Sequence, residues 1–419
     1  MRTRKFPIWL YPALSGALFL IFAVTLPGSA KMRGMDTEPP SSPVQAENTR
    51  PAASAISDFG ARLVADMAAK QPRQNIFVSP LSVFFALSMA ETGSEGKTRA
   101  AIRHALSVPD GISEEQLHDS SFAMLQSLRS QTGVELAIAN GLWSDPSVPL
   151  SPAFVERCRK LFDAQATTLD LRQPSAANVI NDWVKQHTRG KIPTIVTPDT
   201  LRDAKAVLTN AVYFHGKWQH QFSKDKTQNA PFHLVNGQLK TVPMMHQASI
   251  SRAYRKGDGF EAAVLGYEGS QIQFYAILPN PGKRPEDVLT PAALKQLFSP
   301  GMAGELDLSL PRFTLDFSAN LNAPLTRLGM GVAFDRHAAE FAPMGSPQFY
   351  ISDVLHKTRV EVDEEGTVAA ASTAVNMTAT SVVVGQKKTL VFDRPFAVLL
   401  RDGTTGAVLF AGVVYEPMQ

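Results

Sequence analysis

Residues able to do chemistry are present in this chain, but they lack the spacing of a catalytic or metal site. The nine histidines do not fall at the spacing of metal ligands, and we expect His215, His246 and His356 to pack or to form hydrogen bonds. The motifs G-x-S-x-G, H-E-x-x-H and C-x-x-C are absent, and with them the common signatures of hydrolases and metal sites. We therefore expect no enzymatic activity, no metal and no cofactor.

Two further motifs have simple structural interpretations. Gly96-Lys97-Thr98 resembles the end of a phosphate-binding loop, but Glu91 stands where that motif needs glycine, and a helix is expected where it needs a strand. The only cysteine, Cys158, falls on the expected buried side of a helix. Because a lone thiol forms no internal disulfide, the fold must be stabilised by packing.

The segment from Glu364 to Gln386 has the most unusual composition. After Gly366 it contains no charged, aromatic or proline residue, whereas surface loops are usually rich in charged and turn-forming residues. Every second residue from Thr367 to Met377 forms a row that can be buried without an unpaired charge, as in a strand. Gly366 is expected to act as a hinge, because glycine adopts backbone angles closed to other residues. Taken alone, this composition favours an ordinary edge strand or a low-complexity linker.

Residues 1–30 are typical of a secretory leader. Three basic residues, Arg2, Arg4 and Lys5, precede an uncharged run that ends in Gly28-Ser29-Ala30. We expect an exported protein, secreted or periplasmic, with an uncleaved membrane anchor as the alternative, since a span needs about 20 apolar residues. Without these three residues the chain has 38 Lys and Arg against 38 Asp and Glu, which gives no support for nucleic-acid binding.

The remaining 389 residues are expected to contain one α+β domain. Residues 31–55 are rich in Pro, Ser, Ala and Glu and are predicted to be a disordered linker. The domain is predicted over 56–419, with an amphipathic helix from Ile56 and a buried helix that starts at Ser79-Pro80. Further helices are expected at 95–106, 113–129, 151–163 and 175–188, and strands dominate from about 203 onward. Helices early and strands late are typical of the α+β class.

Several segments in order resemble the serpin superfamily over roughly residues 56–417. They include NIFVSPLSVFFALSMAETGSEGKTR, LTNAVYFHGKWQHQF, VPMMHQ, LSLPRFTLDFSANLNAPLTRLGM, VLHKTRVEVDEEGTVAAASTAV and FDRPFAVLLRDGTTGAVLFAGVVYEP. This resemblance implies three β-sheets with eight or nine helices and an exposed reactive loop in a metastable native state. A leader without disulfide-forming cysteines favours a prokaryotic, exported member of this family.

The resemblance also implies a role for individual residues. The hinge of the reactive loop matches Glu364, Glu365, Gly366, Thr367, Ala369, Ala370, Ala371 and Ser372, the pattern of inhibitory members. Ser79, Ser82, Asn210 and His356 match a polar cluster that controls opening of the central sheet, and Trp218 matches the tryptophan where insertion starts. The implied activity is irreversible inhibition of a serine protease, which is acylated by the loop and trapped when the loop inserts into the sheet.

Counted from the hinge at the loop length usual in the serpin superfamily, the resemblance implies that the protease attacks the bond Thr380-Ser381. Because this loop is longer than in many relatives, Ala379, Val382 and Val383 are the alternative specificity residues. All are small, and neither a basic nor an aromatic residue lies between Thr367 and Gln386, so an elastase-like or subtilisin-like protease is expected, with cysteine proteases as further targets. We expect a monomer. The alternative function is that of a non-inhibitory serpin acting as a binding or chaperone-like module.

Overall fold

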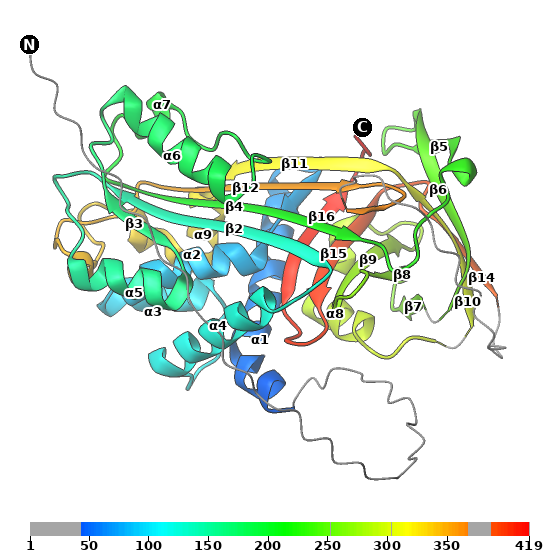
Figure 1. Cartoon of the computed structure of the whole chain (residues 1–419), viewed down its shortest axis with the longest axis horizontal. Coiled ribbons are helices and arrows are strands. Elements are labelled where there is room, and N and C mark those ends of the chain that lie inside the picture. The colour runs from blue at the N-terminus through cyan, green and yellow to red at the C-terminus, as the bar shows by residue number, and fades with distance from the viewer. Residues whose placement is uncertain (1–42, 252, 303, 368–386, 419) are drawn as a thin grey trace, which may run out of the picture. The chain divides into compact units, whose positions relative to one another are not determined.

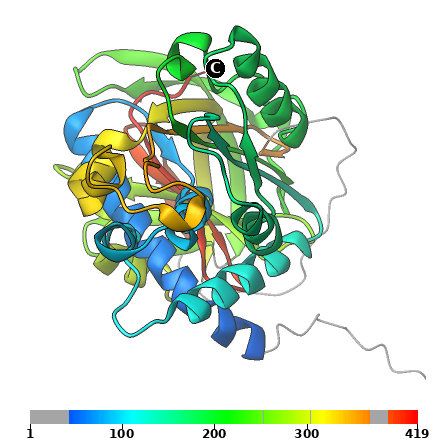
Figure 2. The same cartoon turned by 90° about the vertical axis from the view of Figure 1, so that its left-hand side faces the viewer.

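The computed structural model describes residues 43–251, 253–302, 304–367 and 387–418, and Ser41–Gln419 form one compact unit. The described residues contain nine α-helices and three β-sheets, which confirms the predicted α+β class. In Figure 1, the band of strands β2, β4, β12 and β11 has α6 on one side and α2 on the other. Figure 2 shows the same layers from the end, with the green helices above and the blue and cyan helices below.

The helices begin where the sequence places capping residues. At the start of α2, Ser79 directly precedes Pro80, and its side chain accepts a hydrogen bond from the Ser82 backbone N–H. Ser113 forms a capping box with Gln116 at the start of α4. The Ser151 side chain accepts a hydrogen bond from the Phe154 backbone N–H at the start of α5. Such caps satisfy backbone N–H groups that have no partner within the helix. The α-helices are α1 (Pro43–Lys70), α2 (Pro80–Thr92), α3 (Gly96–Ala105), α4 (Glu114–Arg129), α5 (Pro152–Phe162), α6 (Pro174–His187), α7 (Pro198–Leu201), α8 (Pro291–Leu297) and α9 (Asn322–Leu325).

Helix α1 corrects the predicted boundary of the domain, because it starts at Pro43 rather than near Ile56. Residues 43–55, predicted to be a disordered linker, are helical, and Thr49, Ala52 and Ala55 are fully buried. Alanine has the highest helix propensity, and its small side chain lets α1 pack closely on α4. Pro51 has no N–H to donate to the preceding turn, and the N–H of the next residue, Ala52, donates to Ser120 Oγ on α4 at 3.1 Å.

The central sheet has six strands in the order β11-β12-β13-β4-β2-β3. Helix α6 covers its face with Ile180 and Val184, which belong to apolar clusters that also contain β2 and β4 residues. The strands are β2 (Val134–Ser144), β3 (Gln165–Thr168), β4 (Ala206–Lys217), β11 (Phe313–Asn320), β12 (Asp353–Val362) and the short β13 (Gly366–Thr367).

The other two sheets enclose the main core. The predicted hairpin of β15 and β16 is confirmed as an antiparallel pair, almost fully buried, and β10 buries Leu306, Leu308 and Leu310 in strict alternation. One sheet has the order β1-β16-β15-β9-β8-β7 and the other β14-β10-β6-β5. Their strands are β1 (Ile76–Val78), β5 (Gln228–His233), β6 (Leu239–Ser251), β7 (Tyr254–Gly257), β8 (Phe260–Gly266), β9 (Ile272–Pro279), β10 (Glu305–Pro311), β14 (Lys388–Val391), β15 (Phe396–Asp402) and β16 (Val408–Val414).

The packing of the first half of α1 predicts a sharp difference between two neighbouring positions. Ala55 is fully buried and Ser54 is exposed. Ala55→Asp places an unpaired carboxylate in the core and should destabilise the fold by roughly 3 kcal/mol or more, whereas Ser54→Asp should change stability by less than about 0.5 kcal/mol. Urea unfolding followed by circular dichroism measures both, and equal effects of the two substitutions would contradict the docking of this segment.

Candidate functional site

The central sheet is opened at one end by a short inserted strand. Over most of their length β12 and β4 pair directly in parallel, from Asp353 opposite Val207 to Arg359 opposite Tyr213. Beyond this point β13 lies between them, with Thr367 antiparallel to Val362 on β12 and to Gly216 on β4. We call the β12–β4 boundary the seam. Its open end is occupied by Gly366 and Thr367, which belong to the segment that the sequence singled out.

Gly366 is required here by space rather than by its backbone angles. A Cβ atom at this position would lie 2.1 Å from the Gly216 carbonyl oxygen and 2.8 Å from Lys217 Cα, both backbone atoms that cannot move aside. The left-handed conformation that favours glycine is not used at Gly366. We expected glycine to be needed here for its backbone angles. The structure instead requires glycine because β13 and β4 approach each other closely at this position.

Thr367 is fully buried and faces the core, as the predicted row of alternate residues requires. Its hydroxyl is 2.7 Å from the hydroxyl of Tyr267, which lies at the end of β8 and is itself buried. The Tyr267 ring stacks on Trp218 with a centroid distance of 4.8 Å. Tyr267 was not predicted as a site residue, because nothing in its local sequence links it to a loop so distant along the chain.

Trp218 lies against the turn that precedes β13, at the position expected from the sequence. Its indole Nε1 donates to the Asp363 carbonyl oxygen at 2.8 Å, and its backbone N–H donates to the Glu365 carbonyl oxygen at 2.9 Å. The side chain is 1% exposed. Trp218 therefore fixes the path of the backbone that enters the sheet.

The carboxylates of this turn have separate partners. The Glu364 side chain accepts hydrogen bonds from Arg312 and from the Thr227 hydroxyl, and Glu365 pairs with Lys224. Burial raises the pKa of Glu364, but the hydrogen bonds from Arg312 and Thr227 outweigh burial and hold this pKa below its usual value. Glu364 is thus a buried anion whose charge anchors the base of the hinge.

Asp363 shapes the same turn from within. Its Oδ1 atom accepts hydrogen bonds from the backbone N–H groups of Glu365 and Gly366, at 2.9 and 3.1 Å. Burial nevertheless raises the pKa of Asp363, with further increases from the adjacent Glu364 and Glu365 charges. Three consecutive acidic residues therefore have three different environments.

The predicted polar cluster forms below β13, where the seam is closed. Asn210 on β4 stands opposite His356 on β12, and their side chains share a hydrogen bond across the seam. Ser79 donates its backbone N–H to His356 Nε2 at 3.1 Å, and Ser82 accepts a hydrogen bond from the Asn210 amide. All four side chains are fully buried. The structure thus brings Ser79, Ser82, Asn210 and His356 together as expected.

Asn140 on β2 is a fifth member that the sequence analysis missed. It pairs in register with Asn210, and its Oδ1 atom accepts from both the Asn210 amide and the Ser82 hydroxyl. The hydrogen bonds of the cluster are mutually consistent with a neutral His356 that donates through Nδ1 and accepts at Nε2. Burial lowers the pKa of His356 to about 3, which agrees with the neutral ring.

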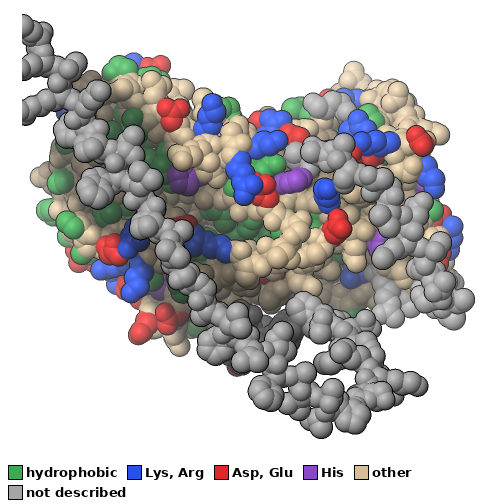
Figure 3. Space-filling model, in the orientation of Figure 1, with side chains coloured by type: hydrophobic (Ala, Val, Ile, Leu, Met, Phe, Trp, Pro, Cys, Tyr) green, Lys and Arg blue, Asp and Glu red, His purple; other side chains and the backbone are tan. Residues whose placement is uncertain are grey.

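Ion pairs on the central sheet lie on either side of the seam. Arg189, in the loop after α6, pairs with Glu135 on β2 at 2.7 Å, and Arg359 on β12 pairs with Asp316 on β11 at 3.2 Å. Neither pair crosses the seam, so parting β12 from β4 breaks neither of them. Figure 3 shows basic and acidic side chains interspersed over the middle of one face of the molecule.

The rest of the predicted loop lies outside the described residues. These positions are Ala369, Ala370, Ala371 and Ser372 of the hinge, and Thr380, Ser381, Ala379, Val382 and Val383 of the predicted reactive bond and its alternatives.

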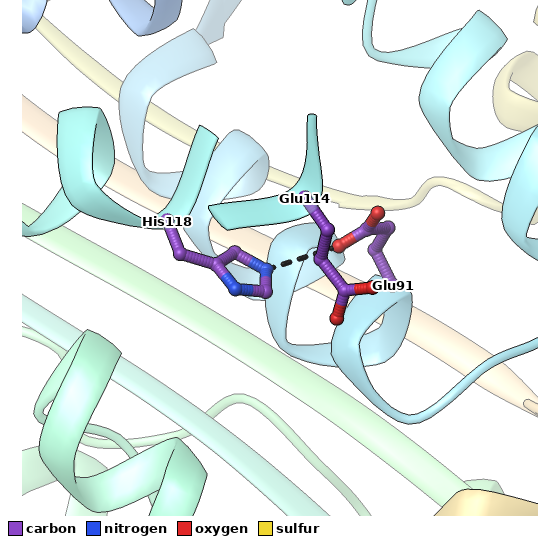
Figure 4. Close-up of side chains that lie close together, drawn as sticks. All are labelled: Glu91, Glu114 and His118. Carbon is purple, nitrogen blue, oxygen red and sulfur yellow. Dashed lines mark hydrogen bonds and ion pairs between the residues drawn. The ribbon is translucent and has the colours of Figure 1, made fainter. Parts of the chain in front are cut away.

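A second cluster of charged residues joins three helices away from the hinge. Figure 4 shows the His118 ring of α4 directed at Glu91 of α2, with Nε2 to Oε2 at 3.1 Å, and Glu114 beside them. Arg103 pairs with Glu91 at 3.1 Å and Arg99 pairs with Glu114 at 2.6 Å. Burial raises the pKa of Glu91, but the hydrogen bonds from His118 and Arg103 outweigh it and lower this pKa. Because each carboxylate already holds an arginine, we interpret the cluster as an ion-pair network that joins α2, α3 and α4.

The fold and the hinge together define a class of protein in which a central sheet holds the start of an added strand. The chain belongs to the serpin family: the family model described as serpin (serine protease inhibitor) matches residues 54–417. The leukocyte elastase inhibitor of Homo sapiens is 33% identical over 381 residues, which cover 87% of this chain and 99% of that protein.

Two solved structures extend the comparison. Human thyroxine-binding globulin superposes with a TM-score of 0.80 at 25% identity, covering 89% of this chain and all of that one. The thermophilic serpin tengpin in its native state gives a TM-score of 0.77 at 28% identity, covering 86% of this chain and 93% of the other. Within the described residues, no helix combines the length and hydropathy needed to span a bilayer.

The polar cluster predicts a pH dependence that His356→Gln removes. Between pH 6.5 and about 3 the unfolded chain binds a proton at residue 356 that the folded protein does not bind. In this window, falling pH therefore destabilises the fold, by about 1.4 kcal/mol per pH unit. Above pH 6.5 the effect is absent. Urea unfolding should be measured for the wild type and His356→Gln between pH 8 and 4.5. The difference between their free energies of unfolding should be constant above pH 7 and should change with pH below pH 6. A difference that stays constant over the whole range would refute the buried neutral ring.

Proposed function

We propose that this protein is an irreversible suicide-substrate inhibitor of serine proteases. The observation that carries the proposal is β13, which occupies the open end of the seam with Gly366 and Thr367 while β12 and β4 remain paired beyond it. The sheet thus already holds the first residues of a strand. The residues that follow Thr367, up to Gln386, contain no charge, aromatic ring or proline that would prevent them from extending this strand. Its relatives include a protein named for elastase inhibition.

The register of β13 indicates how insertion would proceed. Thr367 stands opposite Gly216 and Val362. If the ladder continues at this register, Thr373 comes level with both Asn210 and His356, between the two strands. Insertion breaks the hydrogen bond that Asn210 and His356 share, and a threonine hydroxyl at that level supplies a donor and an acceptor to replace it. Residues without charge or bulk before and after Thr373 pass through the seam at little cost.

The chemistry of trapping uses the catalytic machinery of the protease. The protease serine attacks the carbonyl carbon at the cleaved bond, proposed as Thr380-Ser381, and forms an ester while the amine of the next residue leaves with a proton. Ordinarily water then hydrolyses the ester. Insertion of the freed loop carries the acylated protease along the sheet and distorts its active site before hydrolysis occurs. The outcome depends on a race between insertion and hydrolysis.

The residues around the proposed cleaved bond indicate the class of protease. Thr380 and its alternatives Ala379, Val382 and Val383 are small, and a trypsin-like pocket needs a basic side chain that this loop lacks. We propose elastase-like or subtilisin-like serine proteases as targets, with some cysteine proteases as additional ones. We further propose that the protein acts as an exported monomer after removal of residues 1–30, with anchoring through an uncleaved leader as the alternative.

The proposed specificity can be tested with a panel of proteases. Incubation with pancreatic-type elastase and with subtilisin should give complexes that resist SDS, whereas trypsin should give none. Mass spectrometry of the complex identifies the cleaved bond, expected within two residues of Thr380-Ser381. A stable complex with trypsin alone would refute the proposed class of target.

The insertion mechanism can be tested at Thr367. This side chain is fully buried against Tyr267, so Thr367→Arg must bury an unpaired charge and should slow insertion until hydrolysis prevails. The expected result is cleavage without an SDS-resistant complex, while Thr367→Ser, which keeps the hydroxyl, should remain an inhibitor.

Heat stability after cleavage provides the companion measurement. The melting temperature of the wild-type protein should rise strongly when its loop is cut and inserted. The melting temperature of Thr367→Arg should rise less on cleavage. A wild-type melting temperature that does not change on cleavage would favour a non-inhibitory binding or chaperone-like module.

A further inference from the structure

We propose that a cavity remote from the hinge binds a small apolar carboxylate. The cavity has a volume of about 250 Å³ and lies between the hairpin that joins β5 to β6 and the loop that follows β9. Its wall is completed by Arg394 and Pro395, just before β15, and by Tyr415, just after β16. The site thus lies where two of the three sheets meet, and it does not depend on the proposed inhibitory function.

Part of the cavity wall is apolar and rich in proline. Leu234 and Val235 of the hairpin form one side, and Val235 is 44% exposed, which is unusual for a large aliphatic side chain. Proline has a fixed φ angle, and therefore a proline-rich wall changes little when a ligand enters. The prolines that line the cavity are Pro279, Pro281, Pro285 and Pro395.

The charged side chains that line the cavity are all basic or histidine. They are His233, Lys283, Arg284 and Arg394. Three of them have acidic partners that do not line the cavity. Arg284 pairs with Glu286 and Asp287, and both Arg394 and His233 lie close to Asp393. The cavity therefore presents positive charge to a ligand, with the compensating carboxylates outside it.

Lys283 is the cation that a ligand can reach. Among the described residues its ammonium group has no direct ion pair or hydrogen bond, and the side chain is exposed. Its charge does act on Asp287: burial raises the pKa of that carboxyl, but hydrogen bonds from Arg284 outweigh burial, and Lys283 adds to the lowering. The stem of Lys283 lies on Gly259, where an added Cβ would come within 2.5 Å of Lys283 Cε. The absence of a side chain at Gly259 thus leaves room for the lysine beside the cavity.

Size and charge together select the class of ligand. Binding pockets for drug-sized molecules usually have about 300 to 1,000 Å³, so this cavity suits a smaller molecule. An apolar wall with one available ammonium group fits a single carboxylate attached to a short aliphatic or aromatic body. A polyanion would need a wider basic surface than these four side chains provide.

The test uses 4-phenylbutyrate as the probe, with binding measured by calorimetry on the full-length protein. Two further probes separate the contributions: 4-phenylbutanol keeps the body without the charge, and acetate keeps the charge without the body. We expect 4-phenylbutyrate to bind at least about tenfold more tightly than either. No binding at millimolar concentration, or equal binding of either control probe, would overturn the proposal.

Matched variants locate the site. Lys283→Ala should weaken 4-phenylbutyrate binding by about tenfold, whereas Lys160→Ala, which removes another exposed lysine, from α5, should leave it unchanged. Val235→Ser should weaken binding of both phenyl probes. These positions are exposed, so all three variants should fold, as checked by circular dichroism. Equal binding by Lys283→Ala and the wild type would overturn the assignment.

Discussion

The direct pairing of β12 with β4 is the constraint on which the rest of this structure depends. The other neighbour of each strand, β11 beside β12 and β2 beside β4, is antiparallel to it, so one antiparallel strand in the seam would make the order alternate from β11 to β2. Strand β13 supplies the beginning of that strand, and its described residues are Gly366 and Thr367. The sheet therefore holds both a directly paired seam and the start of a strand between β12 and β4. In the proposed insertion mechanism, the residues around the seam determine how easily the rest of that strand enters.

The two ends of the seam are controlled by different kinds of interaction. At the open end, charges matter: Glu364 is held by Arg312 and Thr227, and Glu365 by Lys224. At the closed part the cluster of serines, asparagines and His356 is neutral and fully hydrogen-bonded. A neutral network can exchange one hydroxyl or amide partner for another without leaving a charge unpaired, whereas an ionic network cannot. This difference is the one that the proposed insertion mechanism needs, with one end of the seam anchored and the middle able to open.

Local patterns in the sequence predicted much of this architecture. Helix starts at Ser79, Ser113 and Ser151 follow from capping chemistry, and the alternation in β10 follows from the geometry of a strand. The residues that were missed, Asn140 and Tyr267, have their role only because distant strands bring them to the seam. The first half of α1 was misjudged for a related reason, since alanine-rich segments are ordered or disordered according to what they pack against.

The pairing of the short strand β1 with β16 bears on how the protein is made. Ile76 lies opposite Val413, so β1 pairs with a strand that comes much later in the chain. Strand β16 also forms the centre of the core with β15, and helices α1 and α2 pack on it. During synthesis the faces of these helices that pack on β16 stay uncovered until β16 has left the ribosome. A chain with such long-range closure folds slowly and exposes hydrophobic surface meanwhile, which makes the nascent protein dependent on protection from aggregation.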